Sequence, residues 1–225
     1  MPLTPRPTLR RLRGIPPAVA LLVVLASCSN ADEGPSETGP GASAAPQATV
    51  SVPSYALLSE SELEGTLLEL DGLPPGYSQD PPTEGGNKYF CDYDPPTEEQ
   101  YRVRRDFTKG GGLSAEVVSL TIRQFESVED AEASWDALVE VTRTCDSEVF
   151  EGSTLNYSPL SAPDLGDASV GVKIDSDGVT ILQNFVRVGP SIVSGGGGGL
   201  VAVDADTIAD LLAKQVDRYT AAASS

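Results

Sequence analysis

Three cysteines, Cys28, Cys91 and Cys145, carry the most distinctive chemistry of this 225-residue sequence, which contains no histidine. Without histidine, neither a Ser-His-Asp nor a Cys-His nucleophile can form, and the commonest general base and zinc ligand is missing. The 33 acidic residues are spread along the chain, and no two stand out by their spacing as an acid–base pair. We therefore expect that the protein is not an enzyme and has no catalytic, cofactor or metal site.

Cys28 ends the segment Leu-Ala-Ser-Cys, directly after an apolar stretch from Ile15 to Ala26. Four arginines and no acidic residue precede that stretch, so residues 1–27 have the regions of a secretory signal. The stretch is too short for a comfortable membrane-spanning helix. Its ending resembles the lipobox of bacterial lipoproteins, in which the cysteine becomes the lipidated first residue of the mature chain. The alternative is a plain secretion signal with a free thiol near its end.

Charge indicates which partners the mature chain can have. Residues 28–225 carry 11 basic and 33 acidic residues, a net charge of −22. Such a surface repels nucleic acid and anionic lipid headgroups. We expect no nucleic-acid partner, and we expect the lipid on Cys28 to hold the protein at the extracytoplasmic face of the cell membrane.

Cys91 and Cys145 remain once Cys28 is assigned to lipid. An even pair of cysteines in an exported domain predicts a disulfide. The two Cα atoms should then lie less than about 7 Å apart.

Composition divides the rest of the chain into two parts. Residues 28–54 are rich in Ser, Gly, Pro, Ala and Thr and predict a disordered tether. Residues 55–221 have the length of one domain. Within it, apolar side chains recur with helical spacing or alternate as in half-buried strands. The predicted helices are 59–70, 127–145 and 204–219, and the predicted strands are 99–108, 113–125, 149–158, 168–175, 179–188 and 190–194.

These elements predict an α+β fold with a single antiparallel sheet, helices packed mainly on one face, and a possible cleft. In the strand 113–125, Val118, Leu120 and Ile122 face one way, and Ser119, Thr121 and Arg123 face the other. The strand 179–188 is apolar on both faces, so one face should meet a helix, a ligand or a partner. The run 195–199 consists of five glycines and lacks the Lys-Ser/Thr ending of a phosphate-binding loop. We expect it to be a flexible hairpin tip.

The order of several short motifs resembles that of a known actinobacterial group. They are a Leu-Pro-Pro-Gly-Tyr turn at 73–77, Cys91, a Phe-x-Ser-x-x-Asp-Ala segment at 125–131 that opens a helix holding Trp135 and Cys145, and a Gly-Asp-x-Ser-Val segment at 166–170. In this order they resemble the extracytoplasmic sensor domain of the PknH-type receptor kinases and related mycobacterial lipoproteins. The resemblance covers most of residues 57–220. It implies an antiparallel sheet with a cleft that binds an unidentified ligand, no catalysis, and one disulfide where family members often have two.

Three residues are candidates for a ligand cleft. Arg105 interrupts an otherwise apolar strand face and could anchor an anion; the simpler interpretation is an arginine near the sheet edge, paired with a carboxylate. Tyr77 and Trp135, together with Tyr89, Phe90 and Tyr93, could line an apolar pocket around Cys91. The alternative is that these aromatic side chains only pack the core and the disulfide.

Two functions fit the sequence. The first is a lipid-anchored binding or sensor lipoprotein of the cell envelope, with a small-molecule, lipid or glycan ligand or an envelope protein partner. The second is an accessory lipoprotein that contacts other envelope proteins and has no small-molecule site. A pocket lined by apolar groups with a few convergent polar ones favours the first function. A filled interior with an exposed apolar patch favours the second.

Overall fold

The computed structural model describes residues 54–82, 91, 93–200 and 204–224. The predicted signal, Cys28 and nearly all of the predicted tether lie outside the described residues, as do Tyr89 and Phe90. These described residues belong to one compact unit.

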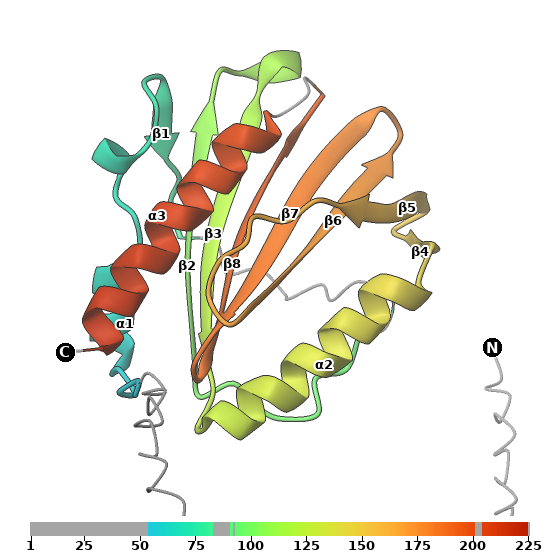
Figure 1. Cartoon of the computed structure of the whole chain (residues 1–225). Coiled ribbons are helices and arrows are strands. Elements are labelled where there is room, and N and C mark those ends of the chain that lie inside the picture. Colours follow the sequence, from blue (N-terminus) through green and yellow to red (C-terminus); the bar gives the residue numbers. More distant parts are fainter. Residues whose placement is uncertain (1–53, 83–90, 92, 201–203, 225) are drawn as a thin grey trace, which may run out of the picture. The chain divides into compact units, whose positions relative to one another are not determined.

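Antiparallel strands of the described residues form one sheet of eight, in the order β1-β2-β3-β8-β7-β6-β5-β4 (Figure 1). This confirms the predicted α+β class and single antiparallel sheet. The glycine-rich strand β8 lies near the centre of the sheet, paired with β3 on one side and β7 on the other. The strands are β1 (Tyr77–Gln79), β2 (Tyr101–Lys109), β3 (Glu116–Gln124), β4 (Ser147–Phe150), β5 (Ser153–Leu160), β6 (Ala168–Ser176), β7 (Val179–Val188) and β8 (Ser191–Gly199).

Helices α1 (Glu60–Thr66) and α3 (Ala205–Ala223) pack on one face of the sheet. Their apolar side chains form a core with Ile122 of β3, Val186 of β7 and Val193 of β8. Two of the three described helices thus lie on one face, as predicted. We call this the α3 face.

Helix α2 (Val128–Thr144) packs on the opposite face, toward one end of the sheet (Figure 1). It buries Trp135 and Leu138 with Phe185 and Ile192. These two strand residues directly adjoin Val186 and Val193, and neighbours along a strand point to opposite faces. The strand β7 is therefore apolar on both sides because each face meets a helix.

Two predicted elements differ from the observed ones because of turn geometry and tertiary contacts. The segment predicted as one strand at 149–158 is a hairpin of β4 and β5, turned at Glu151 and Gly152 with φ of 50° and 90°. The first helix ends at Thr66 and is followed by the short 3-10 helix η1 (Leu70–Gly72). In the segment between α1 and η1, the Gln215 side chain of α3 takes the place of helical hydrogen bonds. It accepts from the Leu68 N–H and donates to the Thr66 carbonyl.

Candidate ligand-binding site

A hollow of about 550 Å³ lies on the face of the sheet opposite α3. Strands β3, β8 and β7 form its floor, β2 contributes one wall, and Leu138 of α2 and Tyr93 close one end. In the register of the sheet, the floor residues run in rows across β3, β8 and β7.

Glycine creates this hollow, because the central strand of the floor has no side chains above much of it. Gly196 lies between Ser119 and Gln183, and Gly198 lies between Val117 and Ile181. A Cβ added to Gly196 would lie 3.1 Å from the Gln183 Oε1 atom, and one added to Gly198 would lie 2.8 Å from the Ile181 Cγ1 atom. A side chain at Gly198 would therefore force Ile181 to move, and one at Gly196 would require a small shift of Gln183.

The prediction that residues 195–199 form a flexible hairpin tip is wrong. These five glycines continue β8, and every one of them pairs with β3 and β7 on its two sides. Glycine weakens a strand by conformational entropy and missing side-chain contacts. Here, pairing on both edges holds the glycine segment in the sheet.

The centre of the hollow is polar. Thr121 pairs with Ser194, and Ser119 and Gln183 flank Gly196, so the four side chains form adjacent rows on the floor. None of the four side chains has a hydrogen-bond partner among the described residues. They present three hydroxyls and one carboxamide that can donate to or accept from a ligand.

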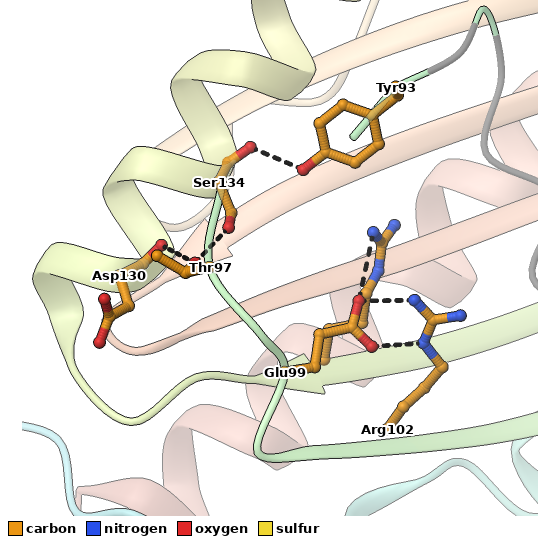
Figure 2. A network of polar contacts seen from close by, with 7 residues as sticks. Tyr93, Thr97, Glu99, Arg102, Asp130 and Ser134 are labelled. Carbon is orange, nitrogen blue, oxygen red and sulfur yellow. Dashed lines mark hydrogen bonds and ion pairs between the residues drawn. The ribbon is translucent and has the colours of Figure 1, made fainter. Parts of the chain in front are cut away.

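Three arginines line the β2 side of the hollow. Arg102 of β2 donates from Nε and Nη2 to the Glu99 carboxylate at 2.6 and 2.5 Å (Figure 2). The same carboxylate lies 3.8 Å from Nη1 of Arg123, which also stacks over the Phe185 ring at 5.7 Å. Arg104 donates from Nε to the Asp106 carboxylate at 2.9 Å, and its side chain is 53% exposed.

The closed end of the hollow is fixed by contacts between α2 and the chain before β2. The Tyr93 hydroxyl donates to the Ser134 carbonyl at 2.9 Å, and the Thr97 hydroxyl lies 2.6 Å from the Ser134 hydroxyl and donates to the Asp130 carbonyl at 3.0 Å (Figure 2). The disulfide Cys91–Cys145 joins the same segment to the end of α2, with Cα atoms 6.1 Å apart. That separation is within the predicted limit.

The three predicted cleft residues do not come together. Arg105 lies on the α3 face, where its Nη1 donates to the carbonyls of Leu67 and Leu68. Tyr77 is buried on that face too, and burial together with a hydrogen bond to Glu116 raises its pKa. Trp135 belongs to α2 and is buried in the cluster between that helix and the sheet, against which Cys91 packs. Of the aromatic residues expected around Cys91, Tyr93 is the one that lines the hollow among those described.

Sequence reasoning missed Arg102 and Arg104, although a signal was present. They alternate with Val103 and Arg105, so they occupy the opposite face of the same strand. The alternation in β3 correctly places Ser119, Thr121 and Arg123 on one polar face, but the pattern alone does not show that this face lines a hollow.

Comparison with known proteins defines the fold class, a PknH-like extracellular-domain fold, without assigning a family. No family model matches the chain, and no curated protein matches it significantly. A solved structure that does match is the crystal structure of the extracellular domain of PknH from Mycobacterium tuberculosis, with a TM-score of 0.58 and 11% sequence identity. The match covers 74% of this chain and 98% of that one. At this identity the similarity shows the fold, and it supports the sequence resemblance at that level.

Among the described residues, none of the helices is long and apolar enough to cross a bilayer.

Proposed function

We propose that the domain is a ligand-binding module and that its ligand occupies the hollow above β8. The observation that carries this proposal is the glycine floor of a central strand, which leaves about 550 Å³ between the side chains of β2, β3, β7 and α2. Small-molecule sites have volumes of about 300–1,000 Å³ and combine an apolar lining with a few placed polar groups. Val117, Ile181 and Phe185 provide the apolar lining, and Ser119 and Thr121 are among the polar groups.

This composition also favours ligand binding over a purely protein-contacting role. An accessory protein without a small-molecule site should fill the space under its helix and present an apolar patch instead. Here the polar floor groups lack partners among the described residues, and burying them under a flat protein surface would leave hydroxyls unsatisfied. The protein-contacting role is the second candidate, and the experiment below separates the two.

We further propose that the module is a lipoprotein exposed outside the cytoplasmic membrane and that it does not catalyse a reaction. The signal-like residues 1–27, the lipobox-like ending at Cys28 and the tether-like composition of 28–54 support the anchoring. The similarity to an extracellular domain fits this location. The lack of histidine and of a nucleophile motif supports a binding role.

Cys28→Ala should abolish lipid attachment, because the thiol is the atom to which the lipid is joined. We expect the variant protein to leave the membrane fraction or to accumulate as an unprocessed precursor, as judged by fractionation and intact mass. The double variant Cys91→Ser, Cys145→Ser is the control, because it removes the other two cysteines and keeps Cys28, and it should stay in the membrane fraction. A processed, membrane-bound Cys28→Ala protein would contradict the anchoring.

Ser119→Trp should block the hollow, because the indole projects from the middle of its floor beside Gly196. The matched control is Ser158→Trp, which adds the same side chain at an exposed position of β5. Native mass spectrometry of protein isolated from its own membrane should show an added small-molecule mass on the wild type and on the control. We expect at least about tenfold less of that mass on Ser119→Trp, equivalent to about 1.4 kcal/mol.

Two results would contradict the proposed site. One is equal occupancy of Ser119→Trp and the wild type when both have the same melting temperature. The other is a wild type that carries no added mass and is not stabilised by any envelope lipid, glycan or metabolite in a thermal-shift screen.

A further inference from the structure

We infer that the ligand of the hollow is an amphiphile with one anionic headgroup, which binds at Arg104, and an apolar body, which lies over the glycines of β8. This inference rests on the proposed function and specifies its ligand class. The charges around the hollow, the polar groups of its floor and its apolar end each contribute to it.

The charge of the lining is opposite to that of the protein. The chain has a formal net charge of −18 and 33 acidic residues, yet among the described residues three arginines and no acidic residue line the hollow. Two carboxylates next to the lining, Glu99 and Asp106, bind these arginines. Among the described residues the lining is thus rich in guanidinium groups, and Arg102 and Arg123 share one carboxylate, which suits a ligand with an anionic group.

Arg104 is the arginine best placed to bind that group. Its hydrogen bonds within the described part of the chain come from Nε alone, to Asp106, so both terminal amino groups remain available. Guanidinium groups bind carboxylates and phosphates through paired N–H donors. Arg102 and Arg123 are held by Glu99 and contribute a positive field from the wall.

Hydroxyl groups continue the polar part of the site from Arg104 across the floor. Arg104 pairs with Thr121 in the register of β2 and β3, and Thr121 pairs with Ser194 of β8. These two hydroxyls therefore lie in the same row as the Arg104 side chain. They can donate to the oxygens of a headgroup that Arg104 holds.

The far end of the floor is apolar and unfilled. Val117 and Ile181 flank Gly198 there, and their side chains are 40% and 36% exposed. Leu113 of the short 3-10 helix η3 (Gly112–Ser114) and Leu200, which follows β8, lie at the same end of the sheet and are 81% and 50% exposed. A free inorganic anion would leave this apolar surface in water, whereas an alkyl chain would cover it, and removing apolar surface from water is favourable.

The inference can be tested with four single-chain probes that differ in their headgroup: decyl phosphate, decanoate, decanol and decylamine. Each is used below its micelle concentration or, for decanol, below its solubility limit. Isothermal titration of the soluble domain, with its disulfide intact, should show binding of both anions. Decanol should bind on the order of tenfold or more weakly, and decylamine more weakly still, because each lacks the charge-assisted hydrogen bonds to Arg104. Inorganic phosphate, which has no apolar body, should not compete with decyl phosphate at equal concentration.

Arg104→Gln should weaken decyl phosphate binding on the order of 10- to 100-fold and leave decanol binding unchanged. Arg143→Gln is the matched control, because Arg143 is an exposed arginine on α2 outside the hollow lining; it removes the same charge and should leave all affinities unchanged. If decanol and decyl phosphate bind with equal affinity, or if Arg104→Gln and Arg143→Gln weaken decyl phosphate binding equally, the anionic class is overturned. The hollow would then remain as a binding site. Competition by inorganic phosphate at equal concentration would overturn the amphiphile. Failure of all four probes to bind, with a small-molecule mass still present on the native protein, would overturn the ligand class alone.

Discussion

Replacing both Cys91 and Cys145 with serine is expected to lower the free energy of unfolding by about 4 kcal/mol. The disulfide closes a loop between residues 54 positions apart, and that loop contains β2, β3 and α2. Opening it raises the conformational entropy of the unfolded chain, which is the main source of the expected loss. Chemical denaturation of the wild type and the double variant measures the effect.

The same substitution should also weaken ligand binding. The disulfide fixes one end of the segment whose Tyr93 side chain closes the hollow, while the Thr97 contacts to α2 remain. Wild-type protein treated with reductant should match the double variant, and the double variant should not respond to reductant. Peptide mapping that finds two free thiols in folded protein would contradict the disulfide, and an unchanged unfolding midpoint after complete reduction would contradict its contribution to stability.

Gly166→Ala is expected to cost about 3 kcal/mol of stability. Gly166 has φ of 59°, a conformation that costs a residue with a Cβ about 1–2 kcal/mol. An added Cβ would also lie 2.4 Å from the Arg187 carbonyl oxygen and 2.7 Å from the Val186 Cγ1 atom. Relieving such overpacking costs about 1–3 kcal/mol more.

Gly178→Ala is the control for backbone strain. Gly178 also has a positive φ, of 85°, but a Cβ there meets open space. Gly178→Ala should lower the free energy of unfolding by about 1–2 kcal/mol. The difference between the losses of the two variants measures the cost of the close contacts at Gly166. Equal losses in thermal or chemical denaturation would contradict the packing described for Gly166.

Gly166 and Asp167 begin the Gly-Asp-x-Ser-Val segment at 166–170. Asp167 accepts from the Gly189 N–H at 2.7 Å and donates its own N–H to the Arg187 carbonyl at 2.8 Å. These bonds hold the β7–β8 turn, after which the chain enters the glycine strand. The Gly-Asp segment does not line the hollow, but it holds the turn that leads into β8, the strand at the centre of the hollow's floor.

Local patterns predicted most of the elements. Alternation in β3 placed Val118, Leu120 and Ile122 on one face, and the structure buries all three. Helical spacing placed Trp135 and Leu138 on the buried side of α2. These predictions succeed because burial of one face imposes the period of the helix or strand on the sequence.

The hollow itself could not be predicted from the same patterns. Five consecutive glycines have no side chains whose period could indicate a strand, and their place in the sheet depends on pairing with β3 and β7. From the sequence, Arg105 is the candidate anion anchor because it breaks an apolar strand face. In the structure it binds the carbonyls that follow α1, and the arginine next to it, Arg104, lines the hollow.

The most direct test of the ligand site is an NMR titration of the isotopically labelled domain with decyl phosphate. We predict that the amide shifts of Gly196 to Gly199, Ser119 and Thr121 change in a saturable way and that those of α3 do not. Arg104→Gln should shift the same curve to higher ligand concentration. Saturable changes confined to the α3 face, or no change on β8 while calorimetry reports binding, would contradict the account.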